Sequence, residues 1–163
     1  MSEFHQFLQA LKQPEYVHVL LNPLPVYATA MGVLGLVIAL FMRSRPAQVL
    51  ALIIVVCGCG SVWPVIEYGE GGYDRVYAMS NKDAQQWLDV HMHRAQHAQY
   101  AFYAIAILAV VTMLALWKLP KFATRLAVLT LAGAILCLGL GAWIGHAGGQ
   151  VRHSEFRDGP PPE

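Results

Sequence analysis

Hydrophobic residues are concentrated in four long stretches of the chain, at about 20–41, 49–66, 98–117 and 126–144. Each stretch is about as long as an α-helix must be to cross roughly 30 Å of hydrocarbon. The segments between the stretches are polar and contain most of the charged residues. The pattern therefore predicts an all-α integral membrane protein whose four spans form an antiparallel helical bundle.

A shorter apolar pattern precedes the first span. Phe4, Phe7, Leu8 and Leu11 recur at helical spacing, as in a short helix that lies on a membrane surface. Pro14 is expected to end this interfacial helix, because proline cannot continue one. The predicted single domain then comprises an interfacial helix and entry (1–17), the four spans, an outer loop (67–97) and a tail (154–163). The end of the tail, DGPPPE, is expected to be extended or disordered.

Composition supports a membrane protein and narrows its chemistry. The 163 residues are 56% hydrophobic and 13% charged, and their mean hydropathy is +0.45, whereas soluble domains contain about 25% charged residues. The net charge of +1 gives no indication of a nucleic-acid partner. The three cysteines lie in apolar runs, without the C-x-x-C-H sequence that attaches a c-type haem. They are expected to be packing residues.

The charged residues predict how the spans are oriented. Arg43 and Arg45 lie between the first two spans, and Lys118, Lys121 and Arg125 lie between the last two. All ten acidic residues lie in the termini and the longer loop. Because basic loops stay in the cytoplasm, both termini and the longer loop are expected outside the inner (plasma) membrane, in the periplasm of a bacterium with two membranes.

Six of the seven histidines lie at the predicted outer end, on three different spans: His18, His91, His93, His97, His146 and His153. At a helical rise of 1.5 Å per residue, His97 and His146 each lie about 31 Å from the cytoplasmic basic residues, and His18 and His93 about 37 Å. His93 and His97 are i,i+4 neighbours and are expected to face inward together. His91, roughly 200° around the helix from His93, is expected at the surface.

Small residues lie beneath the two inner histidines of this arrangement. Ala101 lies one turn below His97, and Gly139 lies two turns below His146. They are expected to leave a gap between the helices that a flat porphyrin would fill. Neutral imidazole is a regular haem ligand and the commonest metal ligand. The candidate partners of the haem propionates are Arg94 and Arg152.

Two sequence segments resemble a known family. The fourth span ends in GHAGGQVRH (Gly145–His153), the first opens with NPLPVYATAMG, and the third opens on histidine. In this layout, from Leu20 to about His153, the chain resembles the bacterial four-span membrane domains of unknown function of the 2231 family. The resemblance implies b-type haem, which that family is suspected of holding, and no established activity. The family's first span usually begins histidine–proline, where this chain has Asn22-Pro23, so His18 is a candidate substitute.

Three functions are compatible with these patterns. The first is a membrane cytochrome b-like electron-transfer protein that holds haem b at the outer end, working with a periplasmic cytochrome, a quinone or a respiratory complex. The second is a protein that binds or transports Zn or Cu through histidine and glutamate. The third is a cofactor-free accessory subunit of a membrane complex. No nucleophile–base arrangement or phosphate loop indicates catalysis by this chain alone, and an oligomer is compatible with the pattern.

The candidate site residues differ between the first two functions. For haem, the axial ligands are expected among His97 and His146, followed by His18 and His93. For a metal ion, the candidate ligands are His97, His146, His18, His93, His153 and Glu67.

Overall fold

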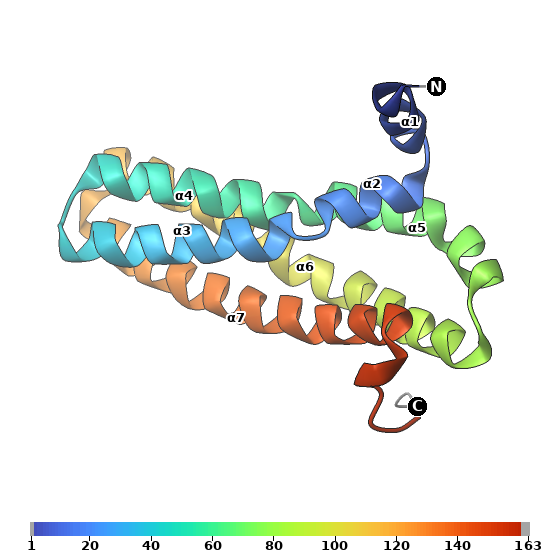
Figure 1. The fold of residues 1–163 in the computed structure, drawn as a ribbon. Coiled ribbons are helices and arrows are strands. Elements are labelled where there is room, and N and C mark those ends of the chain that lie inside the picture. Colours follow the sequence, from blue (N-terminus) through green and yellow to red (C-terminus); the bar gives the residue numbers. More distant parts are fainter. Residues whose placement is uncertain (1, 161–163) are drawn as a thin grey trace. The chain divides into compact units, whose positions relative to one another are not determined.

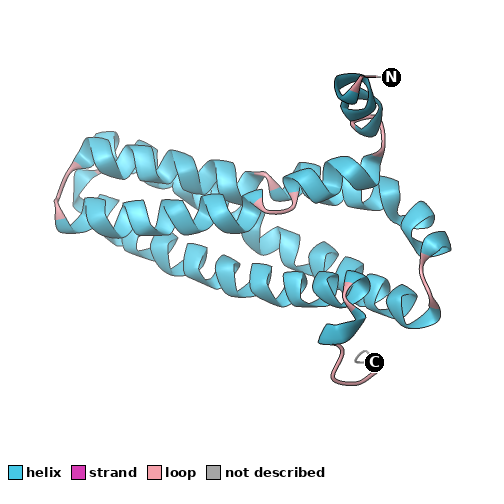
Figure 2. Cartoon of the chain, in the orientation of Figure 1, coloured by secondary structure: helices cyan, strands magenta, loops and turns pink. Residues whose placement is uncertain are grey.

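Helices account for almost all of residues 2–160, the part of the chain that this computed structural model describes (Figures 1 and 2). They are α1 (Glu3–Ala10), α2 (Pro14–Leu21), α3 (Leu24–Phe41), α4 (Arg45–Gly60), α5 (Val62–Met79), α6 (Lys82–Lys118), α7 (Pro120–Arg152) and a short 3-10 helix, η1 (Ser154–Phe156). No strand occurs within these residues. The predicted all-α class is therefore confirmed.

Four helical stretches are long and apolar enough to cross a membrane: Pro14–Phe41, Arg45–Met79, Lys82–Lys118 and Pro120–Arg152. Each contains one of the four predicted apolar segments. Only 28% to 39% of the most apolar part of each stretch is buried inside the chain. Most of these apolar side chains therefore face outward, as expected for helices that contact lipid.

The first stretch is interrupted at Asn22 and Pro23. α2 ends before Asn22, whose N–H donates to the carbonyl of His18 at 2.8 Å. Pro23 follows, and it lacks the N–H that would continue the helical ladder. The second stretch has a similar interruption at Ser61, whose hydroxyl donates to the carbonyl of Gly58 at 2.7 Å. Both interruptions separate a more apolar helix, α3 or α4, from a more polar one, α2 or α5.

The predicted outer loop 67–97 is wrong, because this segment is helical except at Ser80 and Asn81. α5 continues to Met79, and α6 begins at Lys82. The Asn81 side chain accepts a hydrogen bond from the N–H of Ala84 at 2.9 Å, which caps the start of α6. The charged residues expected in a loop therefore lie on helices that extend past the apolar segments.

Pro14 begins a helix instead of ending one. α1 ends at Ala10, and Pro14 is the first residue of α2, a position where its missing N–H costs nothing. The predicted N-terminal helix is present as α1, none of whose residues is buried. Part of the predicted tail, 161–163, lies outside the described residues.

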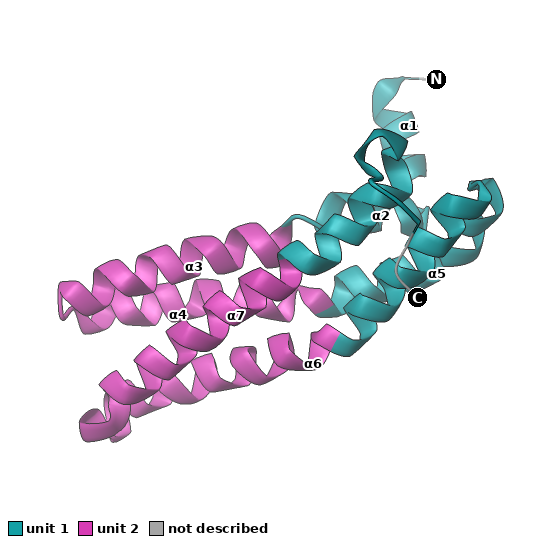
Figure 3. Cartoon of the chain, turned by 90° about the horizontal axis from the view of Figure 1, so that it is seen from below, with its two compact units in different colours: residues 1–23, 63–97, 142–163 teal, residues 24–62, 98–141 magenta. Residues whose placement is uncertain are grey.

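Contacts divide the chain into two compact units, although one domain was predicted (Figure 3). Unit 1 consists of residues 1–23, 63–97 and 142–163, and unit 2 of residues 24–62 and 98–141. Each unit contains segments of all four long helical stretches. The two units are described separately below, because they differ in charge and in chemistry.

Unit 2 is packed through small residues. A Cβ on Gly32 would lie 2.6 Å from Cγ2 of Val55, and one on Gly58 would lie 2.5 Å from the backbone nitrogen of Thr29. Glycine at these positions lets α3 and α4 approach closely, as small residues do in membrane bundles. Cys59 and Cys137 are buried in this core, as predicted for packing residues, whereas Cys57, for which the same was predicted, is exposed. Its other fully buried side chains include Leu36, Leu52, Phe102, Ala109, Thr112, Ala127, Thr130 and Ala134.

Candidate functional site: a histidine pair in unit 1

The structure brings together two histidines from different helices of unit 1. The ring centres of His18 on α2 and His91 on α6 are 6.2 Å apart, and the ring planes are nearly perpendicular, at 84°. Both side chains are partly buried. His18 was predicted as a second-choice ligand, and His91 was expected at the surface.

Each ring is held by the neighbouring helix through the same hydrogen bond. Nδ1 of His18 donates to the carbonyl of Val65 on α5 at 2.8 Å, and Nδ1 of His91 donates to the carbonyl of Ile144 on α7 at 3.0 Å. Nδ1 must carry the proton, because a carbonyl oxygen only accepts. The neutral ring then has its lone pair on Nε2, which is the arrangement found in histidines that ligate a metal through Nε2.

A glycine lies beneath each of these rings. Gly69 and Gly148 each follow the accepting carbonyl by four residues. A Cβ on Gly69 would lie 2.9 Å from Nδ1 of His18, and one on Gly148 would lie 3.0 Å from Nδ1 of His91. In an α-helix the side chain of residue i+4 lies close to the carbonyl of residue i. Glycine at i+4 therefore leaves this carbonyl open to a second donor, and the same local solution occurs twice.

The buried face of α6 decides which histidines point inward. Ala84 and Leu88 are buried, and His91 continues the same helical face at seven residues from Ala84. His93 and His97 lie on the other side and are exposed. The prediction that these two face inward, with His91 at the surface, is wrong. Positions 91 and 93 do lie about 200° apart around the helix, as predicted. The residue that faces inward is His91, however, and not His93.

His93 and His97 contact each other at the surface. Their ring centres are 4.1 Å apart, and Nδ1 of His97 donates to the carbonyl of His93 at 2.8 Å. His97 thus also has its Nδ1 proton directed at a carbonyl, but this carbonyl belongs to its own helix. The bond fixes the ring relative to α6 alone, without linking two helices.

The two predicted histidines near the end of α7 are also exposed. The ring of His146 packs edge-on to Trp87, with centres 6.2 Å apart. His153 donates from Nδ1 to the Glu155 carboxylate at 2.9 Å and stacks on Phe156 at 4.7 Å. The pKa of the Glu155 carboxyl is lowered by a hydrogen bond from its own backbone and then by His153. His153 is thus engaged in a local contact next to η1.

The polar side chains that were predicted to contact haem or a metal ion are exposed or contact other groups of the chain. The guanidinium of Arg94 donates to the carbonyl of Trp143 at 2.9 Å and lies 4.5 Å from the centre of its ring. Arg152 and Glu67 have exposed side chains. Contact of Arg94 or Arg152 with haem propionates, and of Glu67 with a metal, stay predictions.

The small residues expected beneath the inner histidines belong to unit 2. Gly139 is exposed, and a Cβ placed on it would meet no atom within 4 Å. Ala101 is partly buried. Because Gly139 and His146 are both exposed, the face of α7 that carries them points outward. Within the described residues nothing covers Gly139, and a gap for a porphyrin beneath His97 and His146 stays a prediction.

No family model matches the chain, and no curated protein or solved structure is significantly similar to it. The resemblance to the 2231 family stays a prediction based on the layout of the spans and on Gly145–His153. The site is accordingly interpreted from the chemistry of its own residues.

Proposed function

We propose that this chain is a small integral membrane cytochrome b-like protein that transfers electrons, with His18 and His91 as the axial ligands of a b-type haem. One observation carries the proposal: two imidazoles from different helices lie together, and each has its Nδ1 proton fixed on a backbone carbonyl. Imidazoles oriented in this way through Nδ1 are typical ligands of haem iron and of other metals.

The donor set fits a haem better than an ion held by protein side chains alone. A porphyrin supplies four nitrogens to its iron, so two histidines complete the coordination, whereas structural zinc takes four protein ligands. The two ring centres lie 6.2 Å apart, so both imidazoles would be available to one bound group. Within residues 2–160, no group of three or more His, Cys, Asp or Glu side chains converges, so no geometry there favours the Zn or Cu alternative.

The chain's own residues would hold and tune such a group. A bound haem supplies one-electron chemistry at its iron. The carbonyls of Val65 and Ile144 orient the two rings, and by accepting the Nδ1 proton they make Nε2 a more basic ligand. Gly69 and Gly148 let the rings reach those carbonyls. The surrounding apolar helices would lower the local dielectric constant, which raises the cost of charge at the site.

The four apolar helical stretches support an antiparallel bundle inserted in the plasma membrane, with α1 on the membrane surface. The basic residues of unit 2 support a cytoplasmic position for the connection of α3 to α4 and for that of α6 to α7, and an outer position for unit 1 and both termini. At that outer surface, the partners that exchange single electrons would be a periplasmic cytochrome, a quinone or a respiratory complex.

The decisive experiment is the spectrum of the full chain purified in detergent from haem-supplemented cells. We expect a Soret band and a b-type pyridine haemochrome. The variants His18→Ala and His91→Ala should lose the low-spin spectrum. The matched variants His97→Ala and His146→Ala, which change exposed histidines of the same unit, should keep it.

The outcomes separate the three candidate functions. A folded, colourless protein that also fails to bind added haemin would overturn the proposal. Elemental analysis of that sample would then distinguish a Zn or Cu protein from a cofactor-free accessory subunit. Loss of the spectrum in the His97 or His146 variant, with no effect at His18 and His91, would retain haem but refute the ligand assignment. Thermal unfolding of each variant checks that a lost spectrum does not reflect a lost fold.

A further inference from the structure

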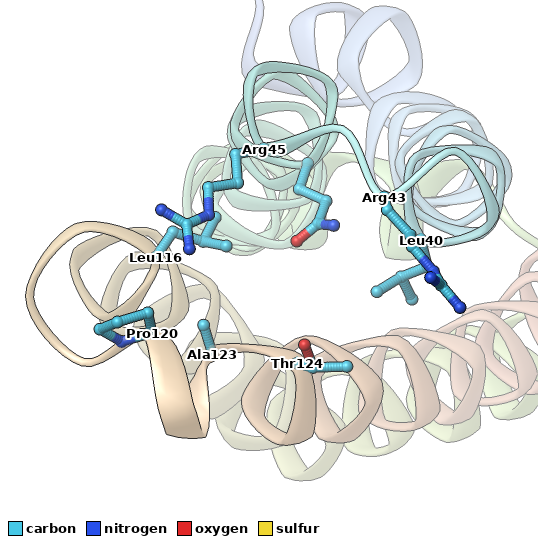
Figure 4. Close-up of a pocket in the computed structure, with 8 residues that line it drawn as sticks. Leu40, Arg43, Arg45, Leu116, Pro120, Ala123 and Thr124 are labelled. Carbon is cyan, nitrogen blue, oxygen red and sulfur yellow. The ribbon is translucent and has the colours of Figure 1, made fainter.

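A cavity of about 270 Å³ lies in unit 2, where α3 turns into α4 and α7 begins (Figure 4). Arg43 and Arg45 line it from the α3–α4 turn, and Thr124 lies on the α7 side. The cavity shares no residue with the histidine pair. It is therefore a separate candidate site.

The charge of this cavity is uncompensated within its unit. Unit 2 contains no aspartate or glutamate at any of its positions, since all ten acidic residues belong to unit 1. The guanidinium groups of Arg43 and Arg45 thus have no carboxylate partner in the unit that holds them. Guanidinium presents paired N–H donors that match the oxygens of a phosphate group. The cavity is suited to an anion with several oxygens.

Helix ends and one buried amide also belong to the lining of this cavity. α4 starts at Arg45 and α7 at Pro120, so the first turns of two long helices, with their partial positive charge, lie at this end. The Gln48 side chain is 7% exposed and donates to the carbonyl of Ala39 at 3.5 Å. The last turns of α3 and α6 supply Leu40 and Leu116 to the same lining, and their partial negative charge offsets that of the two first turns. The attraction for an anion therefore comes from the two arginines, and the buried amide holds the wall of the cavity in place.

The backbone at Arg43 adds an independent observation. Arg43 has a φ of 51°, in the left-handed region that glycine adopts most easily. Its N–H donates to the carbonyl of Leu40 at 3.1 Å, and the N–H of Ser44 donates to that of Ala39 at 3.2 Å. These two bonds close α3 in the way that usually selects glycine. An arginine here accepts backbone strain, and its side chain lines the cavity.

The surroundings of the cavity indicate where its anion comes from. Phe41 is 85% exposed and Trp117 is 80% exposed, and each directly neighbours the lining segments in sequence. Leu119 and Phe122 are exposed as well. A soluble phosphate compound needs no apolar rim of this kind, whereas a phosphate attached to acyl chains would place those chains against it.

We propose that this cavity binds the phosphate group of an anionic phospholipid. The two arginines contact the phosphate oxygens, and the acyl chains lie along the exposed apolar residues of α3 and α6. The inference relies on the membrane insertion proposed above but not on haem. Loss of lipid binding would therefore leave the haem spectrum unchanged, and the two proposals fail separately.

Native mass spectrometry of the full chain, released from detergent after incubation with phosphatidylglycerol or phosphatidylcholine, tests this directly. Wild type should retain phosphatidylglycerol in preference to phosphatidylcholine. The double variant Arg43→Gln, Arg45→Gln should retain about tenfold less, because it removes the charge-assisted donors. The matched double variant Lys121→Gln, Arg125→Gln removes the same charge from exposed positions outside the lining and should stay close to wild type.

Two further outcomes would overturn the proposal. Equal losses in both double variants would show that only the overall charge matters. A second outcome combines two results: wild type retains both lipids equally, and millimolar inorganic phosphate displaces phosphatidylglycerol. Together they would identify the ligand as a soluble phosphate. The variant Arg43→Gly guards against misfolding, since glycine suits the left-handed position. It should unfold at the wild-type temperature or slightly above and still lose lipid, and retention of lipid by this variant would contradict a role for Arg43.

Discussion

Glycine brings helices together in both units, but it meets different neighbours in the two. In unit 2, Gly32 and Gly58 lie against the backbone of the facing helix, so their absence of a side chain shortens the distance between helices. In unit 1, Gly69 and Gly148 lie against imidazole rings. Gly72 of unit 1 also lies against backbone, that of Glu15 on α2, so close packing through glycine occurs in both units. Unit 1 adds two glycines that lie under the rings of the candidate site. What the facing helix presents decides which of the two results.

The units also differ in charge. Unit 1 contains all seven histidines and all ten acidic residues, whereas the charged residues of unit 2 are all basic. These are Arg43, Arg45, Lys118, Lys121 and Arg125. The proposed anion site thus has no carboxylate in its own unit, and both proposed haem ligands belong to the other unit.

The largest effect on stability is expected from Gly58→Ala in unit 2. The added Cβ would lie 2.5 Å from the backbone nitrogen of Thr29 and 2.6 Å from its hydroxyl. Backbone cannot move aside cheaply, so we expect a loss of roughly 3 kcal/mol in the free energy of unfolding. Thermal or denaturant unfolding in detergent measures it. Gly60→Ala on the same helix meets nothing within 4 Å and should be nearly neutral. Equal effects at the two positions would refute close packing through Gly58.

A smaller stability effect, with a large spectral one, is expected from Gly69→Ala and Gly148→Ala in unit 1. Here the added Cβ meets a side chain that can rotate, so the cost should be about 1 kcal/mol. Rotation would pull Nδ1 away from its carbonyl and lower the haem content or shift the spectrum. Gly145→Ala, where a Cβ has open space, is the control on α7. Unchanged haem spectra in the first two variants would contradict the proposed support of the rings.

A third comparison concerns the one pair of buried hydroxyls that α6 and α7 share in unit 2. Thr112 and Thr130 lie 2.9 Å apart, oxygen to oxygen. Such a bond between membrane helices contributes about 0.6 kcal/mol, so Thr112→Val should cost about that much. Each hydroxyl also lies within hydrogen-bond distance of a carbonyl of its own helix, Leu108 or Leu126. The double variant with Thr130→Val should cost little more than the single one, because the single variant already removes the bond between the helices. A double-mutant cycle of unfolding free energies measures the coupling between the two hydroxyls. Fully additive losses would contradict a hydrogen bond between them.

The smallest effect on stability should be a gain. Arg43→Gly replaces a left-handed arginine with the residue that prefers this conformation, although glycine also gains entropy in the unfolded chain. The net stabilisation should be about 0.5 kcal/mol. The midpoint of thermal unfolding measures this effect. Arg45→Gly, which places glycine in the first turn of α4, is the control. A lower midpoint for Arg43→Gly would show that the arginine side chain stabilises the turn.

Much of the fold could be predicted from periodic hydrophobicity. The four apolar segments, the N-terminal helix and the break at Asn22-Pro23 all follow from local patterns of apolar residues and proline. The region 67–97 could not, because its glycines and charges are as typical of a loop as of the exposed end of a helix. An asparagine cap at Asn81 was the available signal that a helix begins there.

The site was harder to predict than the fold. Clustering placed the histidines in one part of the molecule, and all of them indeed belong to unit 1. The inward residue was missed because an i,i+4 pair, His93 and His97, suggested a common face without showing which way that face points. The spacing of His91 from Leu88 and Ala84 carried the correct signal.

The sequence by itself determined which segments are apolar helices, and that the histidines and the basic residues 43–45 and 118–125 belong to different segments, because these features depend on neighbours a few positions apart. Only the tertiary structure decided that His18 faces His91 and that a carbonyl and a glycine of another helix hold each ring. These pairings join residues 47 and 53 positions apart. They depend on how helices rotate against each other to bury their own small residues, and no local pattern records that rotation.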